Sequence, residues 1–217
     1  QLPGISVANY WVDTAEVHGL KRVVSVSENF KREDESLITA NTILKNSLGT
    51  GYLEEFNHRT SLKERIRLLV DAMGEATRMQ NMGAYLTTLF EVDALFLNQD
   101  RHLNNIALIR DKFGYKPCPI FDCGDSFLLD FALYSPEIES RAYLTKAQCL
   151  PFKSRFTQTV HTAQTLYGKQ LAVNIDKTGI DTILDKYLCY YPKQFHFLLK
   201  ERIETVLMEQ QKKLFEK

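Results

Sequence analysis

The stretch FLNQDRHLNNIAL, residues 96–108, concentrates five polar side chains into six positions between two apolar runs. Apolar runs on both sides predict elements that pack into a core, so the polar residues must lie beside that core. One interpretation is a surface loop in which Asp and Asn side chains satisfy turn backbone. The other is a site for a metal ion and a phosphate group. The five residues are Asp100, Arg101, His102, Asn104 and Asn105.

The composition is that of an ordinary globular chain, long enough at 217 residues to bury a core. The 27 basic residues equal the 27 acidic ones, so no overall field attracts nucleic acid or an anionic membrane. No apolar run approaches the roughly 18 residues of a membrane span, and no signal peptide is expected. The cysteines show no C-x-x-C spacing, which favours reduced thiols in the cytoplasm. They are Cys118, Cys123, Cys149 and Cys189.

The N-terminal part of the chain is expected to be extended. In RVVSVSENF, residues 22–30, Val24 and Val26 alternate with serines, which is the period of a β-strand. From residue 31 the pattern changes to that of a helix, through KREDESLITANTILK. The chain begins with Gln1 rather than Met, so we expect a fragment or a processed product.

Apolar residues at helical spacing predict a mostly helical body after residue 60. Ser61 and Glu64 have the spacing of a capping box, which marks the start of the first of these helices. Gly168 is placed to end another. The expected helices cover residues 61–73, 78–97, 154–168, 181–192 and 193–215.

Between these helices the period changes to that of a β-hairpin. NIALIRD (105–111) and PCPIFD (117–122) are short apolar runs joined by KFGYK, with Gly114 in the predicted turn. Because the strands of a hairpin are antiparallel, its two open ends meet at one edge. The residues that flank the hairpin should therefore lie close together.

Three of these flanking residues have the chemistry of a phosphate-transfer site. Asp100 precedes the hairpin, Asn105 begins it and Asp122 ends it. Amide and carboxylate oxygens suit Mg²⁺, which keeps water and substrate phosphate in its coordination shell. A further carboxylate could deprotonate an attacking hydroxyl, as phosphoryl transfer requires. Gly124 is expected to let the backbone turn sharply beside the metal.

These motifs resemble those of a known family. QDRHLNN (99–105) resembles the D-x-H-x-x-N catalytic loop of HipA-type serine/threonine kinases and of phosphatidylinositol 3- and 4-kinases. FDCGD (121–125) resembles the D-x-G metal motif that follows this loop. VSVSENF (24–30) resembles the strand and hinge that hold adenine, and AQCLPFKSRFTQTV (147–160) a segment of the HipA C-terminal region.

The resemblance implies ATP and Mg²⁺ as cofactors and gives each residue a role. Asp100 would be the catalytic base. Asn105 and Asp122 would be the Mg²⁺ ligands, while Asn98 and His102 would brace the loop or approach the γ-phosphate. Asp125 could assist the metal or cap the turn. The residues implied to face adenine are Glu28, Asn29 and Phe30.

The implied fold is α+β and predominantly helical. Residues 1–30 would be the end of an N-lobe sheet with the hinge, and residues 31–217 a kinase-like C-lobe with its catalytic-loop hairpin. Kinases of this kind also carry a Gly-rich loop and a strand lysine before the hinge. Lys21, the first lysine, lies too close to the hinge for that role. We therefore expect most of the N-lobe to be absent from this chain.

The resemblance implies a protein serine/threonine kinase, with autophosphorylation of its own hydroxyls included. A lipid kinase of the phosphatidylinositol type is the second reading, although residues 126–140 contain no Lys or Arg for an anionic head group. The third reading is a catalytically incompetent binding module of a toxin–antitoxin or split-kinase assembly. The expected partners are a protein with Ser or Thr hydroxyls and either an antitoxin or a chain that supplies the N-lobe.

Overall fold

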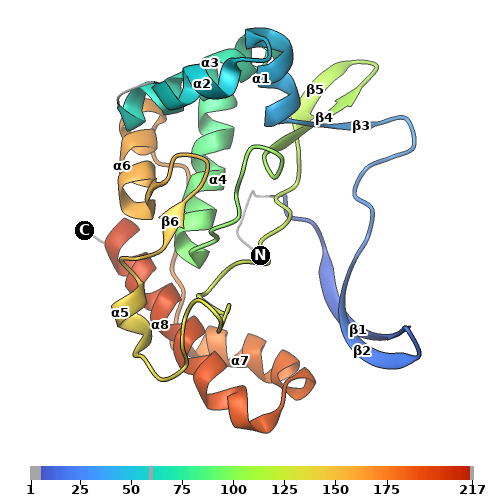
Figure 1. Ribbon diagram of the computed structural model, residues 1–217, viewed down its shortest axis with the longest axis vertical. Helices are drawn as coiled ribbons and strands as arrows, with labels where there is room; N and C mark the ends of the chain where they lie inside the picture. Colours follow the sequence, from blue (N-terminus) through green and yellow to red (C-terminus); the bar gives the residue numbers. More distant parts are fainter. Residues whose placement is uncertain (1–5, 59–60, 216–217) are drawn as a thin grey trace.

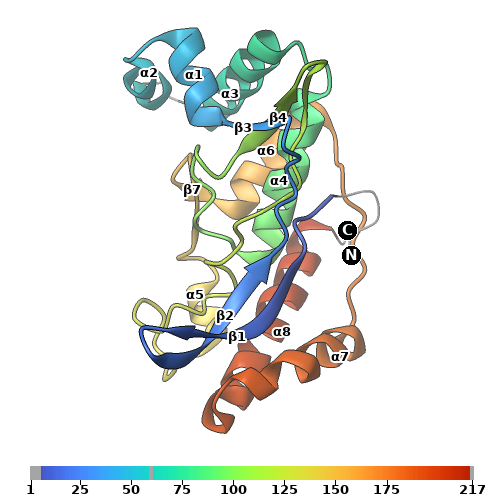
Figure 2. The same cartoon turned by 90° about the vertical axis from the view of Figure 1, so that its right-hand side faces the viewer.

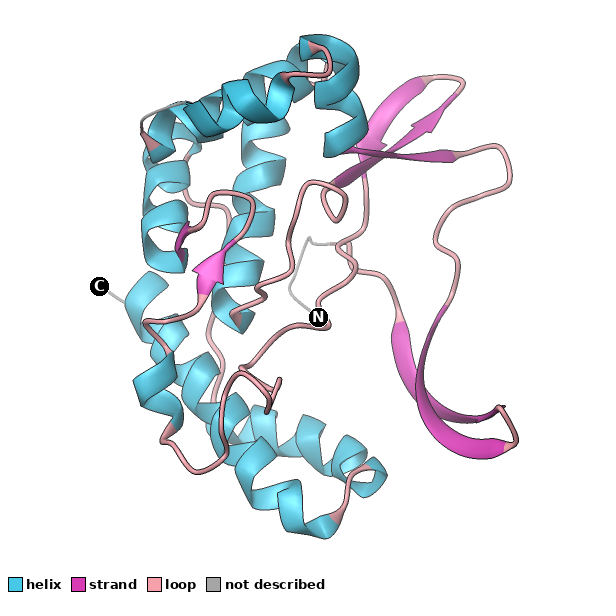
Figure 3. Cartoon of the chain, in the orientation of Figure 1, coloured by secondary structure: helices cyan, strands magenta, loops and turns pink. Residues whose placement is uncertain are grey.

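The computed structural model describes residues 6–58 and 61–215. Its helices gather into one body, and its longer strands lie to one side of that body (Figures 1 and 3). The fold is α+β and predominantly helical, as the sequence predicted. None of the helices in the described ranges is both long enough and apolar enough to cross a membrane.

A hairpin forms the N-terminal part, in agreement with the prediction of extended chain. β1 (Tyr10–Val17) pairs antiparallel with β2 (Leu20–Ser27). Both residues of the intervening turn, His18 and Gly19, have positive φ angles, of 53° and 73°. Such turns match the right-handed twist of paired strands. The hairpin stands to one side of the helical body in Figure 1 and faces the viewer in Figure 2, and most of its side chains are exposed.

The prediction that a helix begins at residue 31 is wrong. Residues 36–39 form β3 (Ser36–Thr39), which pairs with β4 (Ala107–Asp111), and only then does α1 (Ala40–Leu48) begin. Thr39 caps this helix by accepting a hydrogen bond from the Thr42 backbone N at 3.2 Å. The pairing of β3 with a strand some seventy residues later is a tertiary contact that overrides local helical spacing.

The predicted second hairpin is present, but the predicted position of its second strand is wrong. β5 (Gly114–Pro117) pairs with β4, so the second strand ends at residue 117, where the predicted strand (117–122) began. The Asp111 carboxylate accepts from the backbone N of Phe113 at 2.7 Å and of Gly114 at 3.2 Å, which tightens the turn to two residues. Pro117 and Pro119 have no N–H to offer a ladder, so the chain leaves the sheet.

The core is built around α4 (Met82–Phe96), the central helix of Figure 1. Phe90 of this helix packs edge-on against Phe152 at 5.4 Å between ring centroids. α3 (Leu62–Thr77) begins at the predicted capping box, with both bonds of Ser61 and Glu64 formed. Gly168 ends α6 as expected. The remaining elements are α2 (Tyr52–His58), α5 (Ser140–Tyr143), β6 (Gln148–Cys149), β7 (Ser154–Arg155), α6 (Phe156–Tyr167), α7 (Lys177–Tyr187), η1 (Leu188–Tyr190), η2 (Lys193–Phe195) and α8 (His196–Leu214).

One buried carboxylate fastens the segment between the hairpin and β3 to the three-stranded sheet. Glu35 accepts from the backbone N and the Nε of Arg32, both at 2.9 Å, and from Lys116 on β5. The Lys116 hydrogen bond, followed by that of the Arg32 backbone, lowers the pKa of Glu35 from 4.5 to about 2. Because the folded-state pKa is depressed, this stabilisation is present above pH 4.5 and is lost as the pH falls towards 2.

We expect Glu35→Gln to lower the melting temperature at pH 7 and to flatten its decline between pH 4.5 and pH 2. Thermal melts across this range measure both effects. The exposed neighbour Glu33→Gln is the matched control and should follow the unmodified protein. An equally steep decline in Glu35→Gln would show that Glu35 does not carry this part of the acid sensitivity.

Candidate active site

The two predicted motifs are joined by one buried guanidinium, that of Arg101. Its Nε and Nη2 donate to the carboxylate of Asp93 on α4, each at 2.9 Å. Its Nη1 donates to the carbonyl oxygen of Asn105 at 2.9 Å and to that of Phe121 at 2.6 Å. Nη2 also lies 3.2 Å from the Cys123 sulfur. The backbones of the D-x-H-x-x-N loop and of the D-x-G motif therefore meet at a single side chain.

Both members of the ion pair are fully buried, which makes the pair a strong constraint. Burial acts to lower the pKa of Arg101, but the charge and hydrogen bonds of Asp93 outweigh burial and raise that pKa. A guanidinium stays charged in proteins, so its removal would leave a buried carboxylate without a counterion. The position of the loop is thus tied to the integrity of α4.

Asn98 is the second brace of the loop. Its side chain is fully buried, and its Nδ2 donates to Asp93 Oδ1 at 2.8 Å and lies 3.4 Å from the Asp122 carbonyl oxygen. Its Oδ1 lies 3.4 Å from the backbone N of Asp100. Leu97, just before it, has a positive φ of 53° and ends α4. These contacts fit the bracing role rather than contact with a phosphate.

The predicted base lies in the open part of the loop. Asp100 has a side chain that is 48% exposed, and its Oδ1 is 3.8 Å from His102 Nε2. The Asn105 Nδ2 donates to the Asp100 carbonyl at 2.9 Å and lies 3.4 Å from its Oδ2. Because the amide nitrogen of Asn105 is engaged in this way, its oxygen is the atom left to coordinate a cation. The His102 Nδ1 accepts from the Asn104 backbone N at 3.2 Å, so His102 also braces the loop.

The D-x-G motif presents an exposed carboxylate. Asp122 has a positive φ of 54°, and its backbone N lies 3.4 Å from the Tyr10 hydroxyl of β1. The expectation that Gly124 makes the sharp turn is wrong, since Asp122 adopts the left-handed conformation instead. A Cβ at Gly124 would meet no atom within 4 Å, so the space beside the motif is open. Strain of this kind on a non-glycine residue is typical of functional loops.

Asp125 faces the same region as the predicted base. Burial, followed by the charges of Asp100 and Asp130, raises the pKa of Asp125. Its carbonyl oxygen accepts from the backbone N of Gln99 at 2.9 Å, which ties the D-x-G motif to the residue before Asp100. The carboxylates of Asp100 and Asp125, one from each motif, therefore repel one another electrostatically.

The predicted adenine-binding residues lie beside the D-x-G motif. The ring of Phe30 packs against that of Phe121 at 5.8 Å between centroids, next to the buried Ile109 and Cys118. Glu28 and Asn29 are exposed, and Asn29 Oδ1 accepts from the Lys31 backbone N at 3.1 Å. The segment following β2 is thus brought within contact of the residue before Asp122.

The oxygen donors of the two motifs fit a cation whose other ligands are nucleotide phosphate oxygens and water. Within residues 6–58 and 61–215, no three His, Cys, Asp or Glu side chains gather closely enough to hold a metal ion by themselves. Mg²⁺ bound to a nucleotide needs only one or two protein side chains, because phosphate oxygens and water complete its shell. The carboxamide oxygen of Asn105, a residue that is 8% exposed, and the exposed carboxylate of Asp122 are donors of the kind that this requirement calls for.

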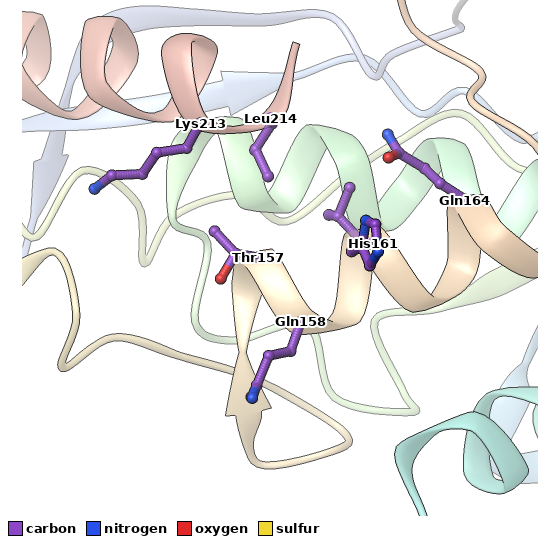
Figure 4. A pocket seen from close by; sticks show the side chains of 7 residues that line it. Thr157, Gln158, His161, Gln164, Lys213 and Leu214 are labelled. Carbon is purple, nitrogen blue, oxygen red and sulfur yellow. The ribbon is translucent and has the colours of Figure 1, made fainter. Parts of the chain in front are cut away.

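Hollows elsewhere on the surface contain none of these residues. One of about 390 Å³ lies between α6 and α8, where His161 and Lys213 line it (Figure 4). Another of about 480 Å³ lies against the start of α4, beside Tyr167. We place the site at the motifs because the polar contacts of Arg101 bring both motifs together there.

The arrangement of a helical body, a catalytic-loop hairpin and small sheets defines a kinase-like α+β fold. Among solved structures, the chain is similar to the proinflammatory kinase CtkA of Helicobacter pylori, with a TM-score of 0.65 and 18% identity. The match covers 97% of this chain and 75% of that chain. No family model and no curated protein matches the sequence. At this identity the similarity establishes the fold, and the HipA resemblance stays a prediction.

The sequence interpretation missed the residues that assemble the site. Asp93 and Glu91 are both fully buried in α4, which is mostly apolar, and acids in such a run are a detectable signal of buried partners. Arg101 lies inside the quoted motif but was given no role. Gln99 and Tyr134, whose hydrogen bond is described below, carry no sequence signal that distinguishes them from ordinary polar residues.

We expect Arg101→Met to lower the free energy of unfolding by about 3–5 kcal/mol, because it leaves the Asp93 carboxylate buried and unpaired. Denaturant unfolding measures this loss. The double variant Asp93→Leu with Arg101→Met should lose less than the sum of the single variants, since it buries no lone charge. The exposed Arg67→Met is the control. Strict additivity of the two single losses would contradict the pairing.

Proposed function

We propose that this chain is the catalytic part of an ATP- and Mg²⁺-dependent phosphotransferase, a HipA-like kinase that phosphorylates Ser or Thr hydroxyls of proteins, its own included. The observation that carries the proposal is the convergence of both motifs on Arg101, whose Nη1 holds the carbonyl oxygens of Asn105 and Phe121. The kinase-like fold supports the same class of reaction. The cytoplasm is the proposed location.

Asp100 is the proposed general base. Its exposed carboxylate accepts the proton of the acceptor hydroxyl while the new O–P bond forms and the bond between the β- and γ-phosphates breaks, so that ADP leaves with the electron pair. Asn98 and His102 hold the loop that carries this base. General-base catalysis contributes about 10²–10⁴ in rate, which sets the size of the effect to be tested.

Asn105 and Asp122 are the proposed holders of Mg²⁺, which when bound neutralises charge on the transferred phosphate. Glu28 and Asn29 would offer backbone groups to adenine, and Phe30 with Phe121 would provide an apolar surface beside it. Asp125 lies near this site, where burial and then the charge of Asp100 raise the pKa of Asp125.

A lipid substrate fits the surroundings less well. Residues 126–140 follow the D-x-G motif and contain the acids Asp130, Glu137 and Glu139 but no Lys or Arg. An anionic head group would meet like charges there and gain no basic partner. A protein acceptor is therefore the substrate class that we propose.

A second candidate, a binding module of a split-kinase or toxin–antitoxin assembly, draws on the exposed hairpin. By the strand register, Trp11, Val17 and Leu20 share one face of β1 and β2, and all three are at least 38% exposed. A two-stranded hairpin is marginal alone and is stabilised by further strands or a packed layer. The proposed occupant of this face is further β-structure of a kinase N-lobe.

We expect Asp100→Asn and Asp122→Asn to lower phosphate transfer at least 10²-fold, because the first removes the proton acceptor and the second a metal ligand. Transfer from labelled ATP to the protein itself and to a basic protein substrate measures this. The chain should be assayed together with any residues that flank it in its gene. Asp71→Asn on α3 is exposed, lies outside both motifs and should keep full activity. Undiminished transfer in either site variant would refute the assignment.

A further inference from the structure

The segment after the D-x-G motif, residues 126–140, is held by a second buried arginine. Arg202 on α8 is fully buried and donates from Nη1 to the carbonyl oxygens of Leu128 at 2.8 Å and Tyr134 at 2.9 Å. Its Nη2 donates to the Ser135 carbonyl at 3.1 Å, and its Nε lies 3.4 Å from the Ser140 hydroxyl. One side chain therefore fixes both ends of a segment with no regular structure before α5.

No carboxylate among the described residues forms an ion pair with Arg202, which distinguishes it from Arg101. Its charge is balanced by the carbonyl oxygens, by the rings of Phe131 and Tyr143, 5.4 and 5.8 Å away, and by the charge of the neighbouring Glu201. Burial lowers the pKa of Arg202, yet a guanidinium keeps its charge at neutral pH. A buried cation outside a direct ion pair is stabilised only while these acceptors stay in place, so Arg202 opposes rearrangement of the segment.

Tyr134 connects this segment to the catalytic loop. Its hydroxyl donates to Gln99 Oε1 at 2.7 Å, and its ring packs edge-on against Tyr143 at 5.1 Å. Gln99 immediately precedes Asp100, and its backbone N donates to the Asp125 carbonyl. A continuous path of hydrogen bonds thus runs from Arg202 through Tyr134 and Gln99 to the residue beside the proposed base.

We infer that Tyr134 is a positioning residue for phosphate transfer: held by Arg202, it fixes Gln99 and thereby the orientation of Asp100 towards the acceptor hydroxyl. This inference rests on the proposed function. It gives Arg202 of α8 an influence on the reacting geometry that passes through Tyr134 and Gln99. It also assigns roles to Gln99, Tyr134 and Arg202, which neither motif includes.

The decisive variant is Tyr134→Phe, because it removes one hydroxyl and keeps the packed ring. A neutral hydrogen bond of this kind corresponds to about a three- to tenfold effect. We expect kcat to fall by that factor, with the KM for ATP and the melting temperature unchanged. The backbone amides of residues 99–105 should exchange hydrogen faster. Gln99→Ala should produce a similar loss, and the double variant little more, since both remove one contact.

Tyr187→Phe, an exposed tyrosine of α7, is the matched control and should behave like the unmodified protein. Arg202→Met removes the whole anchor and is expected to destabilise the fold, so it supports the inference only together with Tyr134→Phe. Unchanged kcat and unchanged exchange in Tyr134→Phe would overturn the inference, as would a loss of kcat that follows a lowered melting temperature.

The same experiment separates the inference from the proposed function. If Asp100→Asn abolishes transfer while Tyr134→Phe keeps full kcat and normal exchange, the positioning role alone is wrong. If Asp100→Asn keeps full transfer, the proposed function is wrong, and a positioning role towards that base is overturned with it. Hydrogen exchange of residues 99–105 needs no activity and tests the physical link from Tyr134 to the loop by itself.

Discussion

The ion pair of Arg101 with Asp93 is the constraint on which the rest of the candidate site depends. A buried guanidinium needs acceptors for its donors, and here those acceptors come from three separate parts of the chain. α4 supplies the carboxylate, and the two motifs supply backbone carbonyls. The side chains of the proposed site residues Asp100, Asn105 and Asp122 take no part in these contacts with Arg101. The carboxylates of Asp100 and Asp122 stay accessible to solvent.

A buried arginine that donates to backbone carbonyl oxygens occurs twice in the protein. Arg101 gathers the loops before and after the β4–β5 hairpin, and Arg202 gathers the segment that follows them. These segments have no regular backbone hydrogen bonding of their own, so their carbonyl groups would otherwise need water or other partners. Gln99, two residues before Arg101 in the chain, accepts a hydrogen bond from the hydroxyl of Tyr134, whose carbonyl oxygen accepts one from Arg202.

Local patterns in the sequence predicted the local features well. The capping box of α3, the end of α6 at Gly168 and the existence of the β4–β5 hairpin follow from residues that contact near neighbours in the chain. β3 could not be predicted in this way, because its partner lies far along the sequence. The same distinction between local patterns and long-range contacts applies to the candidate site. The motif residues were identified by resemblance, whereas Asp93 and Tyr134 act through contacts that only the folded chain brings together.

The central claim is that Asn105 and Asp122, joined through Arg101, form one metal–nucleotide site. Its most direct test is binding of Mn²⁺ in the presence of ADP, followed by electron paramagnetic resonance, in a cycle of Asn105→Ala, Asp122→Ala and the double variant. We expect each single variant to lose most of the nucleotide-dependent Mn²⁺ binding, and the double variant to lose little more, because both residues hold the same ion. Unaltered binding in either single variant, or independent losses that add, would contradict the account.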